Sequence, residues 1–138
     1  MTIKCFKVEK LIRDKIPILL KSKGILIHTE VIKEDQEFIS KLKDKLLEEA
    51  GEVSEALNAD ELCEELADVL EVVYTLSKTS GISIKQIEQK RLKKRELKGG
   101  FENKIYNSFI QIEETNPSID YYVNKPQQYP EMTRTVSA

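Results

Sequence analysis

The sequence has few of the residues that crosslink small proteins or bind zinc: two cysteines, one histidine and no tryptophan in 138 residues. Cys5 and Cys63 do not make a disulfide framework of the kind that holds small secreted domains together. We therefore expect both thiols to be reduced. His28 has no second histidine or cysteine at metal-ligand spacing, so we expect it to have a structural role.

Long apolar runs are also absent. No stretch approaches the roughly 18 apolar residues that span a bilayer, and the N-terminal residues lack the apolar run of a signal peptide. Neither charge sign dominates, because 22 basic residues are balanced by 24 acidic ones. A general nucleic-acid binder is usually basic overall. These features predict a cytoplasmic protein that binds neither nucleic acid nor a membrane.

The length suits one domain with one hydrophobic core. Periodicity and composition predict a mainly α fold, an antiparallel helical bundle. The predicted helices are residues 10–23, 34–58, 60–80 and 83–98. Two segments rich in β-branched and aromatic residues predict a small two-stranded β element that packs on the helices. These segments are residues 25–32 and 101–112.

Local signals define the helix ends. Pro17 suits the first turn of the first helix, where a missing N–H is tolerated. Asp60 is the expected N-cap of the third helix, and glycines at 24, 81 and 99 end three of the helices.

The C-terminal residues 116–138 differ from the rest of the chain. They contain prolines and glutamines without any period, which is typical of a disordered terminus. We therefore divide the chain into a domain at residues 1–115 and a tail at 116–138. If the tail is ordered, Tyr121, Tyr122 and Tyr129 are expected to dock on this chain or on a partner subunit.

A similar acidic, amphipathic sequence motif occurs twice in succession. LLEEAGEVSEAL starts at Leu46, and LCEELADVLEVV starts at Leu62. At about 100° per residue, Glu49 and Glu52 lie near −60° and −120° from Leu46 on the helical wheel. Glu65 and Asp68 lie at the same two angles, measured from Leu62, on the second helix. Consecutive similar helices are related by an approximate two-fold axis, so we expect the two acidic pairs to face each other.

Four facing carboxylates need a counter-charge. At about 5 Å and an effective dielectric constant near 20, each pair repels by roughly 3 kcal/mol. Acidic residues on helices are commonly just solvated, but matched pairs on two helices argue against that interpretation here. A hard divalent cation with oxygen ligands neutralises such a cluster, and Mg²⁺ also shares its ligand shell with phosphates.

These motifs resemble a known family. EEAGE (48–52) followed by ELAD (65–68) resembles the EExxE and ExxD signature of the MazG-like all-α NTP pyrophosphohydrolases. KLIRDKIP (10–17) and the basic helix running into KGGFENKIY (98–106) resemble its phosphoribosyl-ATP pyrophosphohydrolase-like, house-cleaning branch. The matching blocks lie between about residues 8 and 107.

The resemblance implies an activity, a cofactor and an assembly. Water would attack a nucleoside triphosphate with Mg²⁺ bound, or Mn²⁺ in its place, and release a monophosphate and pyrophosphate. The chain would assemble as a homodimer or homotetramer. The implied metal ligands are Glu49, Glu52, Glu65 and Asp68.

Other residues are candidates for catalysis and substrate binding. Glu48 lies near −160° on the wheel, farther from the apolar stripe than the two predicted ligands on its helix, so we predict a general base or water-orienting residue. A triphosphate also needs cations, although runs of basic residues are commonly plain solvated surface. The basic candidates are Arg13, Lys15, Lys90, Arg91, Lys94 and Arg95.

The sequence is also compatible with two other functions. One is hydrolysis of phosphoribosyl-ATP in histidine biosynthesis, which uses the same kind of site on another nucleotide. The other is a non-catalytic helical dimer whose acidic flank docks a basic partner. Stoichiometric metal binding and pyrophosphate release distinguish the enzymes from the docking module.

Overall fold

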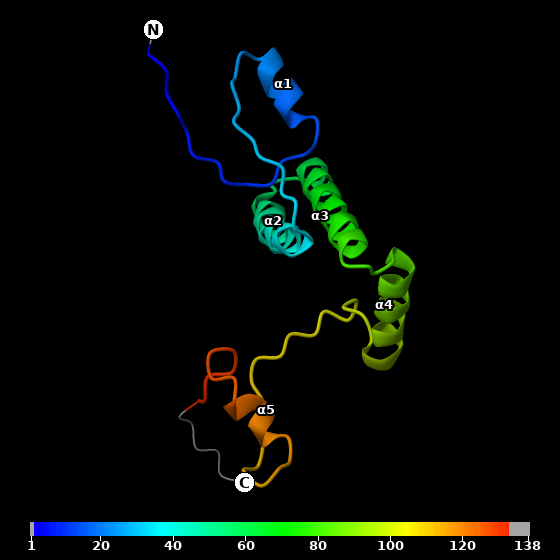
Figure 1. Ribbon diagram of the computed structural model, residues 1–138. Coiled ribbons are helices and arrows are strands. Elements are labelled where there is room, and N and C mark those ends of the chain that lie inside the picture. The colour runs from blue at the N-terminus through cyan, green and yellow to red at the C-terminus, as the bar shows by residue number, and fades with distance from the viewer. Residues whose placement is uncertain (1, 133–138) are drawn as a thin grey trace. The chain divides into compact units, whose positions relative to one another are not determined.

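The computed structural model describes residues 2–132, which form helices and no strand (Figure 1). Two compact units are divided after Lys98. The mainly helical fold class is confirmed. No helix in this described range is long and apolar enough to cross a membrane. The helices are α1 (Ile16–Ser22), α2 (Asp35–Glu55), α3 (Ala59–Thr79), α4 (Ile84–Lys98) and α5 (Ile119–Val123).

Helix α1 is shorter than predicted, since it begins at Ile16 rather than at residue 10. Pro17 lies in its first turn, as expected from the fixed φ and missing N–H of proline. Residues 10–15 therefore stay outside the helix. Gly24 follows the helix with a φ of 77°, a left-handed conformation that glycine adopts without steric cost.

Helices α2 and α3 pack against each other and contain the buried core (Figure 1). Leu42 and Val72 are its buried apolar side chains, and Glu49 is buried with them. On α3, in contrast, the apolar side chain of Leu66 is 45% exposed. Part of the apolar surface of α3 therefore remains exposed to solvent.

The start of α3 corrects one prediction. Its N-cap is Asn58 and not Asp60: Asn58 Oδ1 accepts a hydrogen bond from the Glu61 backbone N–H at 2.9 Å. Asn58 has extended backbone angles, which let its side chain reach back to the first turn, whereas Asp60 is already helical. The Glu61 carboxylate accepts from the Leu57 N–H in return, at 2.9 Å. These bonds fix the short connection between α2 and α3.

Helix α4 ends at Lys98 as predicted and begins at Ile84, one residue later than predicted. A capping box starts it, in which Ser83 Oγ accepts from the Gln86 N–H at 3.1 Å and Gln86 Oε1 accepts from the Ser83 N–H at 2.8 Å. Gly99, with a φ of 84°, follows its last residue. No residue of α4 is buried. Capping and glycine signals therefore determine this helix without help from a core.

The predicted two-stranded β element is wrong, because neither residues 25–32 nor residues 101–112 form a strand in the described chain. The two segments belong to different compact units. A strand requires a hydrogen-bonded neighbour, and β-propensity reports side chains that suit a pleated surface rather than a partner that is present.

The unit that starts at Gly99 contains a cluster of aromatic rings. Tyr121, Tyr122 and Tyr129 are in mutual contact, with ring centroids 5.1 to 5.7 Å apart. Lys125 Nζ lies 4.2 Å from the centroid of the Tyr121 ring. Helix α5 and this cluster replace the disorder that composition predicted for the described part of the tail. The same prediction for residues 133–138 falls outside the described range.

Candidate metal centre

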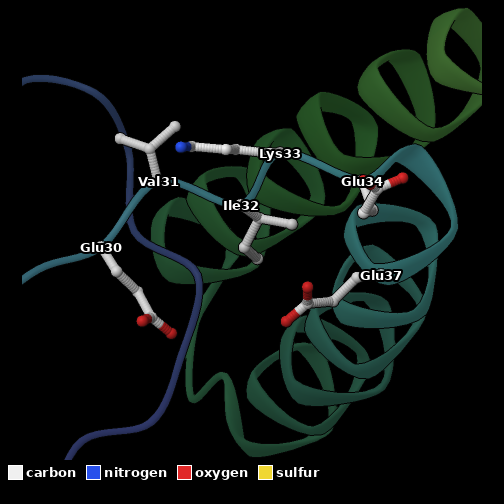
Figure 2. Close-up of a pocket in the computed structure, with 6 residues that line it drawn as sticks. All are labelled: Glu30, Val31, Ile32, Lys33, Glu34 and Glu37. Carbon is white, nitrogen blue, oxygen red and sulfur yellow. The ribbon is translucent and has the colours of Figure 1, made fainter.

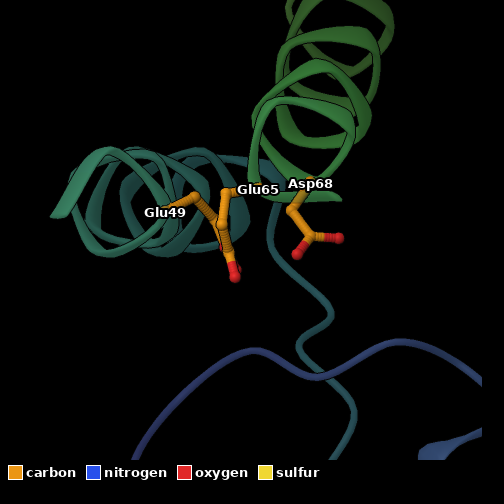
Figure 3. A group of neighbouring side chains, drawn as sticks. All are labelled: Glu49, Glu65 and Asp68. Atoms are coloured by element: carbon orange, nitrogen blue, oxygen red, sulfur yellow. The ribbon is translucent and has the colours of Figure 1, made fainter. Parts of the chain in front are cut away.

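Three carboxylates from two helices meet at the contact between α2 and α3. Glu49 comes from α2, and Glu65 and Asp68 come from α3, about one turn apart (Figure 3). One oxygen from each residue lies within 4.8 Å of the corresponding oxygens of the other two. We call these three residues the carboxylate cluster. The duplicated sequence motif predicted that acidic residues of the two helices would face each other in this way.

The carboxylate cluster is partly shielded from solvent. Glu49 is only 9% exposed, and its carboxylate is paired with the ammonium of Lys45 at 3.5 Å, since a buried ionised side chain requires a partner. Partial burial raises the pKa of Glu65, and the negative charges of Asp68, Glu52 and Glu49 raise it further. The carboxylates therefore repel one another, and a cation bound among them would relieve that repulsion.

Glu52 lies just outside this arrangement. It is exposed and is not one of the three residues whose oxygens come within 4.8 Å of one another. Its charge is nevertheless close enough to contribute to the raised pKa of Glu65. The structure thus brings together three of the four predicted ligands, and ligation by Glu52 stays a prediction.

The donor set fits a hard divalent cation. All three residues offer carboxylate oxygens, and neither histidine nor cysteine contributes to the group. Mg²⁺ and Mn²⁺ favour such oxygen ligands, whereas zinc sites are typically built with nitrogen or sulfur. Residues Glu49, Glu65 and Asp68 are therefore suited to hold Mg²⁺ or Mn²⁺.

Glu48, the predicted base, is bound by two lysines. Lys45 Nζ lies 3.2 Å from Glu48 Oε2 and 3.5 Å from Glu49 Oε1, so it bridges these two glutamates. Lys10 Nζ lies 3.3 Å from Glu48 Oε1. Partial burial would raise the pKa of Glu48, but hydrogen bonds and positive charge from the two lysines outweigh it and lower the pKa. Glu48 is therefore held in its ionised form.

Arg13 contacts the carboxylate cluster directly. Its Nη2 donates a hydrogen bond to Asp68 Oδ1 at 2.7 Å, a contact between the N-terminal segment and α3. The predicted site residue Lys15 is exposed and is the N-cap residue of α1. Of these two N-terminal candidates, the structure brings Arg13 to the cluster.

The basic residues of α4 are arranged differently. Arg91 Nε donates to the carboxylate of Glu88 on the same helix at 3.0 and 3.1 Å. Lys90, Lys94 and Arg95 are exposed. Within residues 2–132, the only extended contact between helices is the one between α2 and α3. The structure therefore does not bring the predicted α4 cations to the carboxylate cluster.

Two cations at the site were missed in the sequence. Lys45 could have been found, because positions three and four before a glutamate share its helix face. Lys10 gave no comparable local signal, since its partner Glu48 lies on another segment of the chain. Its place depends on the path of residues 10–13 past the helices.

A separate depression of about 330 Å³ lies at the entry to α2 (Figure 2). It is lined by residues 30–34, which lead into α2, and by Glu37 in the first turn of that helix. None of the predicted site residues lines it. The depression therefore does not contribute to the candidate metal centre.

A family model described as the MazG nucleotide pyrophosphohydrolase domain matches residues 29–98, just over half of the chain. This chain belongs to that family. The resemblance found in the motifs is thus confirmed, and the protein is an enzyme of the class that hydrolyses phosphoric anhydrides. The MazG domain spans α2, α3 and α4 and includes the whole carboxylate cluster.

The MazG match begins after the segment that carries Lys10 and Arg13. Comparisons with curated proteins and with solved structures gave no match. The contacts of these two residues with Glu48 and Asp68 are therefore a feature of this structure that the family match does not cover.

Proposed function

We propose that the protein is a Mg²⁺-dependent nucleoside triphosphate pyrophosphohydrolase that removes non-standard nucleotides. It converts a nucleoside triphosphate and water into a nucleoside monophosphate and pyrophosphate. The observation that carries this proposal is the carboxylate cluster of Glu49, Glu65 and Asp68 inside the MazG domain. A cytoplasmic location is part of the proposal, because nucleoside triphosphates are available there.

In the proposed mechanism, Glu49, Glu65 and Asp68 hold the cation, with Glu52 as a further ligand from α2. When bound by these residues, Mg²⁺ would supply charge stabilisation at the reacting phosphate and would orient the attacking water. Arg13 holds one oxygen of Asp68, which restricts that side chain as outer-shell hydrogen bonds restrict metal ligands in general.

Glu48 is the proposed base or water-orienting residue. Its carboxylate is ionised near neutral pH, but the lowered pKa makes it a weaker proton acceptor than an ordinary glutamate, which favours the water-orienting role. The bridge from Lys45 to Glu48 and Glu49 fixes the proposed base next to a proposed ligand. Glu48 is thereby restrained close to the cation that would orient the water.

Basic residues are the proposed contacts for the negatively charged substrate. Cations stabilise the charge that phosphoryl chemistry carries into its transition state. Arg13 is already within the site, so its remaining donors can face a phosphate. The proposed contacts that lie elsewhere in the described structure are Lys15, Lys90, Arg91, Lys94 and Arg95.

A second copy of this chain is the proposed partner of an exposed apolar face on α3. Leu62, Leu66, Leu70 and Tyr74 follow each other at four-residue spacing and are 39% to 52% exposed. The same helix contributes buried Val72 to the core, so a homodimer or homotetramer would extend an apolar surface that already exists.

Light scattering tests this assembly. Leu66→Asp should reduce the mass of the particle to that of the 15.9 kDa chain, whereas Leu97→Asp on α4 should leave it unchanged. A wild-type particle with the mass of one chain would refute the proposed oligomer.

A pyrophosphate-release screen tests the activity itself. Standard, oxidised and deaminated nucleoside triphosphates and phosphoribosyl-ATP are supplied with Mg²⁺ or Mn²⁺, and pyrophosphate is measured. We expect release from non-standard nucleotides, dependent on the metal and lost in Glu49→Gln. Absence of pyrophosphate from all substrates would refute the proposed function, and preferential release from phosphoribosyl-ATP would replace its substrate.

A further inference from the structure

We propose that Lys10 and Arg13 form a phosphate-binding pair that receives oxygens of the triphosphate beside the carboxylate cluster. The inference rests on the proposed function and extends it, because it adds Lys10 to the substrate-binding residues and assigns the pair its ligand. The chemical class of the ligand is a polyphosphate chain with a bound divalent cation.

The pair contacts both helices of the candidate metal centre. Lys10 Nζ lies 3.3 Å from Glu48 Oε1, on α2. Arg13 Nη2 lies 2.7 Å from Asp68 Oδ1, on α3. One short segment thus places two cations against carboxylates of both helices that build the candidate metal centre. A phosphate chain attached to a cation in the cluster would lie within reach of both side chains.

Both side chains retain hydrogen-bond donors and access to solvent. Ammonium and guanidinium groups carry several N–H donors, and Lys10 and Arg13 each have one carboxylate partner. Their side chains are 53% and 57% exposed, so a ligand from solvent can reach them. Lys45 differs, since its side chain is 21% exposed and its ammonium is shared between two glutamates. We therefore assign Lys45 to holding those glutamates and Lys10 to the phosphate.

The backbone immediately before Lys10 has an unusual conformation. Glu9 has a φ of 49°, in the left-handed region that residues other than glycine adopt rarely. Such conformations persist where the surrounding structure determines them, and they are frequent at binding sites. Here the left-handed residue turns the chain immediately before Lys10, the residue that contacts Glu48.

The negative charge of the carboxylate cluster and of a polyphosphate explains why two cations are needed at this position. A polyphosphate that approaches a carboxylate cluster is repelled by it, and one divalent cation neutralises only part of the combined negative charge. Within residues 2–132, no extended contact joins α4 to α2 or α3. The N-terminal segment, in contrast, places cations against Glu48 and Asp68. The N-terminal segment therefore provides positive charge that can contact the phosphates next to the carboxylate cluster.

The test compares Lys10→Gln with the matched control Lys7→Gln. Lys7 belongs to the same exposed segment and pairs with Glu9 at 3.4 Å. Calorimetry measures binding of inorganic triphosphate in the presence of Mn²⁺, and separately binding of Mn²⁺ alone. We expect Lys10→Gln to weaken triphosphate binding about tenfold, the usual effect of losing a hydrogen bond to a charged group. Lys7→Gln should have no effect, and Lys10→Arg should restore most of the affinity.

Several outcomes would overturn the inference. These are equal triphosphate affinities in Lys10→Gln and Lys7→Gln, no triphosphate binding by the wild type, or an equal loss of affinity for Mn²⁺ alone. The last result would mean that Lys10 only supports the metal site. Failure of the proposed function looks different: no nucleotide releases pyrophosphate, whereas Lys10→Gln still weakens binding of inorganic triphosphate.

Discussion

Arg13 Nη2 donates a hydrogen bond to Asp68 Oδ1 over 2.7 Å, although 55 positions separate the two residues in the sequence. The contact joins the N-terminal segment, which precedes the MazG match, to a carboxylate inside that match. Lys10 makes a parallel contact with Glu48. The candidate site therefore consists of the α2 and α3 carboxylates together with the basic segment at residues 10–13.

Arg13→Gln should affect activity more than stability. The Arg13 and Asp68 side chains are 57% and 38% exposed, and ion pairs at such positions contribute about 0–1 kcal/mol to the free energy of unfolding. The same substitution removes a proposed phosphate contact, so kcat/KM should fall about 10-fold to 100-fold. Urea unfolding and steady-state kinetics measure the two effects. A large loss of stability with normal turnover by the folded fraction would show that Arg13 is only structural.

Glu52→Gln and Asp68→Asn should each abolish turnover and weaken Mg²⁺ binding at least about tenfold, because each removes a proposed ligand charge. Helix content should stay unchanged, since neither residue is a helix cap. Metal titration calorimetry, circular dichroism and pyrophosphate release provide the measurements. Glu52→Gln is the more decisive test of metal ligation, because Glu52 lies outside the three-residue carboxylate cluster and only its effect on metal binding can show that it is a ligand. Wild-type hydrolysis in both variants would eliminate the proposed metal site.

Glu48→Gln should lower kcat by about 10²- to 10⁴-fold, the usual contribution of a positioned base, with nearly unchanged Mg²⁺ affinity. Single-turnover hydrolysis and metal titration separate the two effects. Glu37→Gln at the start of α2 is the conservative control, and it should behave like wild type. If metal affinity in Glu48→Gln collapses as in Glu52→Gln, Glu48 is a ligand. If turnover is unaffected, another group accepts the proton.

Lys94→Ala should raise KM for the triphosphate about tenfold if α4 contributes a phosphate contact, as proposed. Lys85→Ala is the matched control, because Lys85 is also exposed and lies about 180° away from Lys94 on the α4 wheel. Steady-state kinetics and inhibition by the monophosphate product are compared in both variants. Identical constants for the two would assign the basic residues of α4 to plain solvated surface.

Glu65→Gln should stabilise the metal-free protein near neutral pH. The pKa of Glu65 is raised by partial burial and by neighbouring carboxylates, so the folded state binds this proton more tightly than the unfolded chain. Its contribution to stability is therefore present below the unfolded pKa and is lost as the pH rises through the folded pKa.

Thermal melts in EDTA measure the sign of this effect. We expect the Tm of Glu65→Gln to exceed that of wild type at about pH 7 and to match it at about pH 3. Saturating Mg²⁺ should reverse the order near neutral pH, because only wild type keeps the full ligand set. A variant that is less stable than wild type in EDTA at about pH 7 would contradict the repulsion among the carboxylates.

The sequence by itself determined the features that depend on neighbouring residues. The bounds of α4 follow from the Ser83 and Gln86 capping box and from Gly99. The pairing of Glu65 with Asp68 on one face of α3 follows from the helical repeat, and so does the contact of Lys45 with Glu48. These relationships are local because side chains three or four positions apart are neighbours on any helix.

Only the tertiary structure decided the rest. Whether Glu49 is buried and Leu66 exposed depends on how far each helix turns about its axis when α2 and α3 pack. The contact of Lys10 with Glu48 depends on the path of a segment without regular structure. The missing strand pairing has the same origin, because hydrogen bonds between distant segments form only if the chain brings those segments together. Such contacts are set by the free energy of packing the chain as a whole, which no local pattern of residues specifies.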